Sequence, residues 1–179
     1  MKVLAICGSL RATSSNTAII RAAARLAPAG MEVVEFERLA ALPHFSQDLD
    51  VEPLPEPVRD LRARIADAGA LFISSPEYAH GMPGSLKNAL DWLVSAVEAM
   101  DKLVLLISAS PGGAAHAHAQ LAEVLRTMNL RLVDGGAHVF TRARLDAQGD
   151  VADPEMRATI ARALAELAVA AANPHPDDR

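Results

Sequence analysis

Five short apolar runs alternate with segments of helical periodicity along this chain. The runs have the length of buried strands and lie at residues 3–6, 31–36, 70–74 and 103–108, with the fifth at either 130–133 or 137–141. The helical segments lie at residues 14–26, 57–68, 84–99, 115–128 and 154–171. Strands that alternate with helices pair in parallel, because each helix carries the chain back to the start of the next strand. The sequence therefore predicts an α/β fold, a doubly wound five-stranded parallel sheet with helices on both faces.

Length and composition favour one domain in a reducing compartment. The 179 residues suffice for a single core, which we place at residues 1–172, followed by a frayed tail at 173–179. A net charge of −5 without a basic run argues against nucleic acid or an anionic membrane as a partner. No stretch approaches the roughly 20 apolar residues of a membrane span. The single cysteine, Cys7, excludes an intrachain disulfide, so we expect a cytoplasmic protein in which Cys7 is a buried, small apolar side chain.

The loop between the first strand and the first helix is dense in hydroxyl groups. Residues 8–16 read GSLRATSSN, with one guanidinium among the hydroxyls. A helix amino end has unpaired N–H groups and a partial positive charge, so such a loop can hold a phosphate. The simpler interpretation is that Thr13 or Ser14 caps the helix and the other polar side chains are solvated. Because a short connection needs only one cap, the sequence favours an anion site.

Three polar or glycine-rich loops follow strand ends, at residues 8–16, 75–84 and 108–113. In open parallel sheets these loops share one edge, where ligands bind at the point of reversed strand order. The first loop has neither G-x-G-x-x-G nor G-K-[ST], so it is neither the usual dinucleotide fingerprint nor a P-loop. A monophosphate with a flat body that reaches the other two loops fits this arrangement.

Two motifs, in this order, resemble those of the NADPH-dependent FMN reductase family, which includes soluble quinone, chromate and azo reductases. The first is GSLRATSSN at residues 8–16. The second runs from PEY at 76–78 through PG at 83–84 and LKNA at 86–89 to DWL at 91–93. The likeness covers residues 2–132, and it implies a flavodoxin-like fold with FMN as the cofactor.

The resemblance also implies cofactor contacts residue by residue. Those to the FMN phosphate fall on the first loop, at Ser9, Arg11, Ser14 and Asn16, and Ser15 and Thr17 beside them are expected to bind the cofactor as well. Those to the flavin ring fall on the second loop, at Pro76, Glu77, Tyr78 and Ala79, and the backbone of the third loop approaches the ring at Ser110, Gly112 and Gly113. The family commonly has Asn after PEY, so Ala79 removes a polar contact there.

The activity implied is an NAD(P)H-dependent oxidoreductase in which hydride passes from NADPH or NADH through flavin N5 to a small acceptor such as a quinone. Because the flavin carries the redox chemistry, we expect no catalytic acid or base, and ping-pong kinetics. The rivals are an FMN electron carrier and a flavin-binding regulatory module without turnover. Carriers typically shield both flavin faces with aromatic rings. Because this chain has only one Trp and one Tyr, an open flavin face is favoured. The resemblance further implies a homodimer, or a homotetramer of such dimers.

Two segments have two interpretations each. The proline-rich loop at residues 39–57 either crosses the surface or uses Pro43, His44 and Phe45 to rim a binding cleft. Trp92 either belongs to the core or lies with its helix in the dimer interface.

The charged groups near the motifs also leave alternatives. Glu77 is either a proton donor or an anchor for its loop, and Arg11 could contact a nicotinamide 2′-phosphate instead of the FMN phosphate. His116 and His118 lie two apart on a predicted helix, so they point in different directions and cannot hold one metal ion. We therefore expect no metal site.

Overall fold

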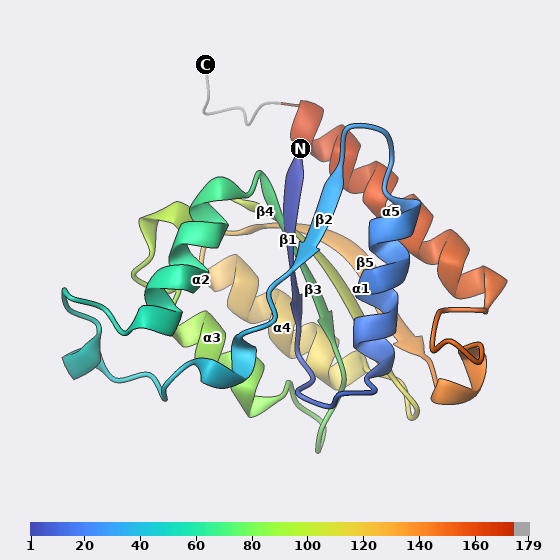
Figure 1. Cartoon of the computed structure of the whole chain (residues 1–179), viewed down its shortest axis with the longest axis horizontal. Coiled ribbons are helices and arrows are strands. Elements are labelled where there is room, and N and C mark those ends of the chain that lie inside the picture. Colours follow the sequence, from blue (N-terminus) through green and yellow to red (C-terminus); the bar gives the residue numbers. More distant parts are fainter. Residues whose placement is uncertain (174–179) are drawn as a thin grey trace.

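A parallel sheet forms the centre of the computed structural model, which describes residues 1–173. Its strands follow the order β2-β1-β3-β4-β5, the order of the flavodoxin-like fold. The predicted five-stranded parallel sheet is confirmed (Figure 1). The strand bounds are β1 (Lys2–Cys7), β2 (Glu32–Glu35), β3 (Ala70–Ser75), β4 (Leu103–Ser110) and β5 (Arg131–Val139).

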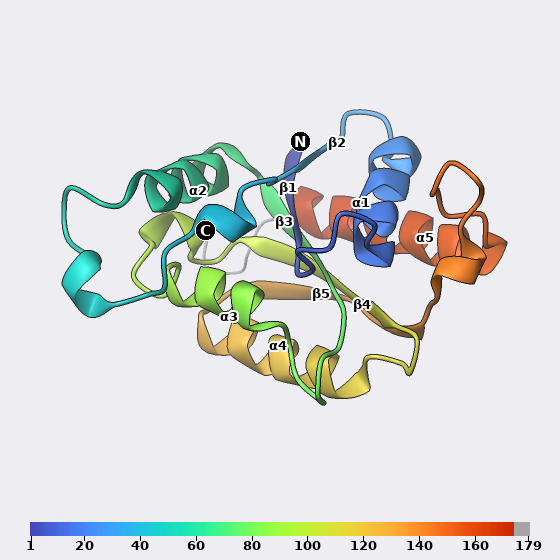
Figure 2. The ribbon, with the colours of Figure 1, turned by 60° about the horizontal axis from the view of Figure 1, so that its bottom comes forward.

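Helices cover both faces of the sheet, as predicted. They are α1 (Ser15–Leu26), α2 (Glu56–Asp67), α3 (Gly84–Asp91), α4 (Ala115–Thr127) and α5 (Pro154–Ala172). The two faces are packed by different helices: α1 and α5 lie on one, and α2, α3 and α4 on the other (Figure 2). None of the described helices combines the length and apolarity needed to cross a bilayer.

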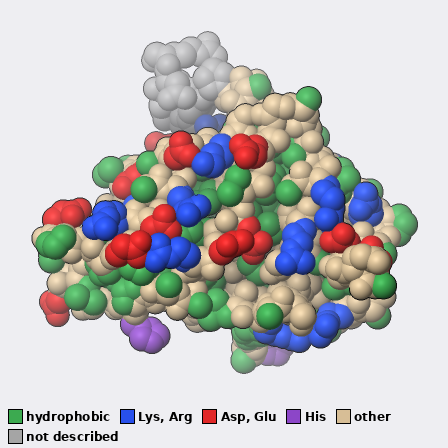
Figure 3. All heavy atoms as spheres, viewed as in Figure 1, with side chains coloured by type: hydrophobic (Ala, Val, Ile, Leu, Met, Phe, Trp, Pro, Cys, Tyr) green, Lys and Arg blue, Asp and Glu red, His purple; other side chains and the backbone are tan. Residues whose placement is uncertain are grey.

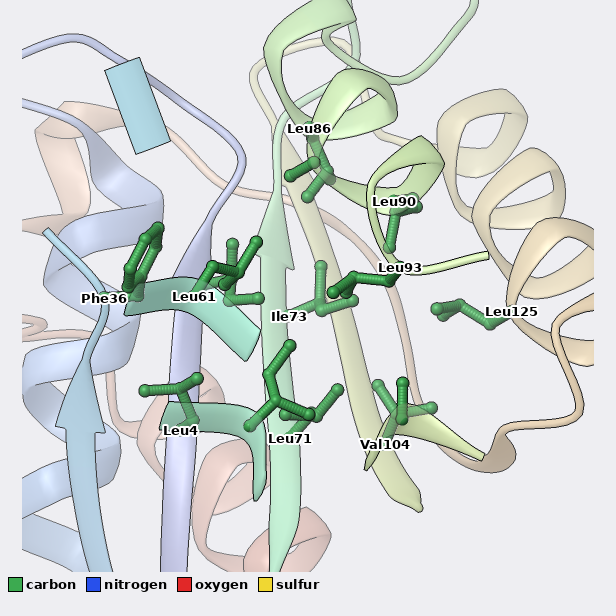
Figure 4. Close-up of a cluster of buried hydrophobic side chains, with 14 of the residues drawn as sticks. Leu4, Phe36, Leu61, Leu71, Ile73, Leu86, Leu90, Leu93, Val104 and Leu125 are labelled. Carbon is green, nitrogen blue, oxygen red and sulfur yellow. The ribbon is translucent and has the colours of Figure 1, made fainter. Parts of the chain in front are cut away.

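The core is aliphatic on both sides of the sheet. On the face covered by α2, α3 and α4, Leu61, Leu90 and Leu125 gather over the strand residues Leu71 and Val104 (Figure 4). All five side chains are at most 1% exposed. Burial of each aliphatic side chain contributes about 1.5–3 kcal/mol. The central strands β1, β3 and β4 are thus buried on both faces, which explains why they read as continuous apolar runs, whereas the edge strands β2 and β5 are only partly buried.

One strand replaces the two alternatives for the fifth position. β5 runs through both predicted segments, since it includes residues 131–133 of the first and 137–139 of the second. Its pairing with β4 is irregular between them, opposite Leu106 and Ser108. Gly135 and Gly136 lie at this point. A Cβ on Gly135 would lie 2.5 Å from Ile107 Cγ1 and 2.8 Å from the Leu106 oxygen, so glycine allows the close approach. The glycine pair explains why the sequence pattern looked interrupted.

The helix predicted to reach residue 99 ends at Asp91, so its C-terminal bound was wrong. The guanidinium of Arg62 donates to the carbonyl oxygen of Trp92 at 2.7 and 3.1 Å. The chain then continues in tight turns to a 3-10 helix at Val97–Ala99. Val97, which lies within the range predicted as helix, is 76% exposed. The Arg62 side chain, 30 residues away in sequence on α2, thus binds the Trp92 carbonyl oxygen, which would have accepted a backbone N–H if α3 had continued.

The segment at residues 39–57 packs against α3 and the residue that follows it. The Pro43 oxygen accepts hydrogen bonds from Trp92 Nε1 at 2.8 Å and Asn88 Nδ2 at 2.9 Å. The rings of Phe45 and Trp92 meet edge to face, 5.1 Å apart. Trp92 itself is fully buried, which confirms its interpretation as a core residue.

Charged side chains of both signs are interspersed over the face seen in Figure 3. That distribution agrees with the absence of a basic run in the sequence. The expected frayed tail falls, beyond Asn173, outside the described residues.

Candidate functional site

The loops after β1, β3 and β4 meet at the carboxyl edge of the sheet, next to the reversal of strand order between β1 and β3. They enclose a small cavity of about 120 Å³. Seven of the expected contact residues line it: Ser9, Arg11, Ser15, Asn16, Pro76, Tyr78 and Ser110. A larger cavity, of about 660 Å³, lies at the opposite edge, near Met1 and Gly69, away from these loops. The structure therefore brings the first, second and third loops together at one place.

The first turn of α1 is capped from within the loop. Ser14 is the N-cap, and its hydroxyl accepts a hydrogen bond from the Asn16 N–H at 3.1 Å. The capping interpretation is confirmed for Ser14 rather than Thr13. The amide of Asn16 donates to the Ala109 oxygen and accepts from Ser74 Oγ, both at 3.0 Å. Because the Asn16 side chain is 3% exposed and bonded at both ends, it holds the loop against β3 and β4.

Two guanidinium groups face the cavity without a partner of opposite charge. Arg11 comes from the first loop, and Arg142 comes from the 3-10 turn Arg142–Arg144 that follows β5. Within residues 1–173, neither forms an ion pair. The hydroxyl of Ser9 accepts from the Arg11 N–H at 3.3 Å and lies 3.4 Å from the Tyr78 hydroxyl. Cationic and hydroxyl groups at a helix amino end suit an anion such as a phosphate.

Sequence reasoning missed Arg142, which lines the cavity with Ala109, Pro111 and Phe140. A signal was present, since the sequence TRAR follows the last apolar run and the carboxyl ends of parallel strands share one edge. Because the end of the fifth strand was uncertain, the sequence did not show that Arg142 follows a strand end.

The other expected contacts lie outside the lining of this cavity: Ser14, Thr17, Glu77, Ala79, Gly112 and Gly113. Thr17 Oγ1 lies 3.3 Å from Cys7 Sγ, below the loop. Cys7 is 6% exposed and burial raises the pKa of its thiol, which agrees with a buried, unreactive side chain. Gly113 takes φ +87° and donates its N–H to the Ser110 oxygen, which turns the third loop toward α4.

Glu77 anchors its loop to the start of α4. Its Oε2 accepts hydrogen bonds from the N–H groups of His116 at 2.9 Å and Ala117 at 3.0 Å. These bonds, that of Ala117 foremost, lower the pKa of Glu77. The group is therefore an ionised carboxylate at neutral pH with no proton to donate, and the anchoring interpretation is the one that fits.

A tight hairpin follows Glu77. Tyr78 and Gly81 exchange backbone hydrogen bonds at 2.9 and 3.0 Å. The two residues between them, Ala79 and His80, both have positive φ, at 49° and 58°. Left-handed backbone is uncommon without glycine or asparagine, so the turn is held by its surroundings.

His118 lies in a hydrogen-bonded chain that joins two strands. Its Nδ1 is 3.0 Å from Ser108 Oγ, and its Nε2 is 2.9 Å from Asp134 Oδ1. The Ser108 side chain is fully buried, so the chain supports the sheet and offers no accessible nucleophile. His116 points elsewhere, toward His80, and the two helix histidines do not share a ligand.

Comparisons with known proteins agree with this arrangement. The chain is 33% identical over 173 residues to an NAD(P)H-dependent FMN reductase of Pseudomonas aeruginosa, and the matched region covers 93% of each chain. It is 29% identical over 178 residues to an NAD(P)H:quinone oxidoreductase of Solanum tuberosum, covering 93% of this chain and 91% of the relative.

Solved structures and a family profile give the same result. The flavoenzyme FerB, an NAD(P)H:(acceptor) oxidoreductase of Paracoccus denitrificans, superimposes with a TM-score of 0.81 at 26% identity, over 94% of this chain and 97% of FerB. The sequence profile described as NADPH-dependent FMN reductase matches residues 1–144. The chain therefore belongs to the NADPH-dependent FMN reductase family of flavodoxin-like oxidoreductases.

Proposed function

We propose that this protein binds FMN at the carboxyl edge of its sheet and transfers electrons from NAD(P)H to a quinone-like small acceptor. The observation that carries the proposal is the pair of unpaired guanidinium groups, Arg11 and Arg142, beside the Ser9 hydroxyl at the amino end of α1. This donor set matches a phosphate monoester. Family membership and the named activities of the relatives support the same cofactor and substrates.

The chain's own residues bind and orient. Arg11, Arg142 and Ser9 would hold the phosphate, while Asn16 keeps the first loop in place through Ala109 and Ser74. Pro76 and Tyr78 would lie against the ring. The chemistry that FMN supplies when bound is hydride transfer through N5 from NAD(P)H to the acceptor, with the two substrates using the site in turn.

An open face for the two substrates is favoured over the shielded flavin of an electron carrier. Trp92 is fully buried against Pro43 and cannot cover a ring. The aromatic side chains that line the cavity are Tyr78, which is 47% exposed, and Phe140, which is fully buried. This scarcity of exposed aromatic side chains supports a flavin with one open face.

Purified protein tests the proposal directly. We expect a yellow protein that releases FMN on heating, and that oxidises NADPH rapidly when a soluble quinone is present. Initial rates at varied NADPH and quinone should give parallel double-reciprocal lines, the sign of ping-pong kinetics. Protein that neither retains FMN nor is stabilised by it would contradict the proposal, and FMN binding without turnover would favour a regulatory module.

We also place the enzyme in the cytoplasm as a homodimer. The single, buried Cys7 suits a reducing compartment. The segment after α3 exposes Val94, Val97 and Met100 by 69%, 76% and 54%. Contact with a second copy of the chain would remove this apolar surface from water.

A further inference from the structure

Three side chains with metal-binding atoms meet where the hairpin after β3 touches α4. The carboxylate of Glu77 and the imidazoles of His80 and His116 have ligand atoms that all lie within 4.8 Å of one another. The two rings meet edge to face with centroids 4.4 Å apart. His80 Nδ1 is 3.4 Å from Glu77 Oε1. We propose that Glu77, His80 and His116 form a binding site for a divalent transition-metal ion such as Zn²⁺.

Hydrogen bonds hold the hairpin against α4 and leave the proposed metal-binding atoms without other partners among the described residues. Glu77 uses Oε2 to cap α4, while Oε1 faces His80. Gln120, one turn further along α4, accepts the Met82 N–H at 2.9 Å. The hairpin is therefore held to α4 on both sides of His80, and only side-chain rotations are needed to reach a metal.

The distances suit such a rotation. Metal–nitrogen bonds of about 2.0–2.1 Å put ligand atoms about 3.3 Å apart in a tetrahedral site. The His80 side chain is 78% exposed, so it can turn toward the other two without disturbing the core. The exposed side of the cluster leaves room for water as a further ligand.

The chemistry of the donors selects the class of metal. Two imidazoles with one carboxylate suit Zn²⁺, Co²⁺, Ni²⁺ or Cu²⁺, whereas Mg²⁺ and Ca²⁺ prefer oxygen ligands alone. The amino end of α4 would repel a cation, but the Glu77 carboxylate lies against it.

The backbone of the hairpin turn presents His80 to the cluster. Ala79 and His80 occupy two consecutive left-handed positions, a backbone that Gly, Asn, Asp and His adopt more readily than Ala does. The turn places the His80 ring against the His116 ring, with centroids 4.4 Å apart. A metal bound here would join the hairpin that carries Tyr78 to α4.

Metal titration of the full chain, with any affinity tag removed, tests the site. We expect Zn²⁺ to bind with a stoichiometry of one in calorimetry, Co²⁺ to give visible absorption bands that Zn²⁺ removes, and Mg²⁺ to give neither signal. His80→Asn keeps the turn preference and removes the imidazole, and His116→Ala keeps the N–H that binds Glu77. Each should weaken Zn²⁺ binding by about tenfold or more.

His44→Ala is the matched control, because His44 is also exposed but lies on the segment packed against α3. It should leave the Zn²⁺ affinity unchanged. If either cluster variant bound Zn²⁺ as tightly as wild type, or if His44→Ala weakened binding equally, the proposal would be overturned. Hydrogen exchange gives an independent readout, in which Zn²⁺ should slow the amides of residues 79 and 80 in wild type and in His44→Ala, but not in His80→Asn or His116→Ala. All these signals can be measured without FMN, so they do not depend on the proposed enzymatic activity.

Discussion

Asn16 and Ser74 join the first loop to the third strand of the sheet across 58 positions of sequence, with Ser74 Oγ donating to Asn16 Oδ1 at 3.0 Å. The same amide donates to the Ala109 oxygen on β4. One side chain thus fixes the loop after β1 to both β3 and β4 along the edge where ligands bind. The finding makes Asn16 a positioning residue for the loop that carries Ser9 and Arg11.

Replacing Asn16 should lower the stability of the fold. Asn16→Ala leaves the Ser74 hydroxyl and the Ala109 oxygen buried without partners, so we expect a loss of about 2–3 kcal/mol in the free energy of unfolding. Ser74→Ala should cost about 1 kcal/mol, and the double variant less than the sum. Urea denaturation measures all three. Strictly additive losses would show that the bond between the two side chains contributes nothing.

Arg142 should matter to FMN binding as much as Arg11 does. Each guanidinium faces the cavity without a charged partner among the described residues, so each can form a charge-assisted hydrogen bond to the phosphate. Arg142→Ala and Arg11→Ala should each weaken FMN binding by about tenfold. Fluorescence quenching of free FMN measures the affinity. Riboflavin, which lacks the phosphate, should bind wild type and both variants alike.

Arg59→Ala provides the control for this experiment, since Arg59 is an exposed arginine of α2 on another part of the surface. Its FMN affinity should equal that of wild type. An equal loss in all three variants would point to a general effect of net charge instead of a phosphate contact.

The sheet and its helices could be predicted because their signals are local. The central strands β1, β3 and β4 are buried apolar runs, and each helix has its own periodicity, so no long-range contact was needed to find them. The end of α3 could not be predicted, because Arg62 from α2 takes the Trp92 carbonyl. The same holds for Asn16, whose type and position suggested a phosphate ligand but whose partners, Ser74 and Ala109, are distant in sequence.

The cap that Glu77 provides should make stability depend on pH. Its pKa in the folded protein lies below the ordinary value of 4.5, so the stabilisation is complete above pH 4.5 and is lost as the pH falls through the lower, folded value. Glu77→Ala should lower the Tm at pH 7 by about 2–4 °C, and Glu77→Gln by less, because the amide oxygen still accepts hydrogen bonds. Thermal melts should show the gap between wild type and Glu77→Gln narrowing from pH 7 to pH 3. Glu166→Gln, in the middle of α5, is the matched control and should melt like wild type at each pH. A Tm difference between wild type and Glu77→Gln that widened toward pH 3 would contradict the role of Glu77 as a cap.

Gly135 should tolerate no side chain. Its Cβ would meet Ile107 Cγ1 at 2.5 Å and the backbone oxygen of Leu106 at 2.8 Å, so β4 and β5 would have to separate. We expect Gly135→Ala to lower the free energy of unfolding by about 2–3 kcal/mol. Gly84→Ala is the control, because nothing lies within 4 Å of its Cβ position at the start of α3. That variant should be neutral or more stable by about 0.5 kcal/mol, and similar losses at both glycines would argue against the close approach of the strands.

The exposed valine of the segment after α3 tests the proposed dimer. Val97 is 76% exposed on a 3-10 turn beside Val94 and Met100, and a charge placed there would have to be desolvated on association. Val97→Asp should therefore shift the mass measured by light scattering from dimer to monomer while the thermal melt stays cooperative. Val169→Asp is matched to it, since Val169 is 63% exposed on α5, which covers the opposite face of the sheet. It should remain a dimer, and a dimer that survives Val97→Asp but is lost in Val169→Asp would move the interface to α5.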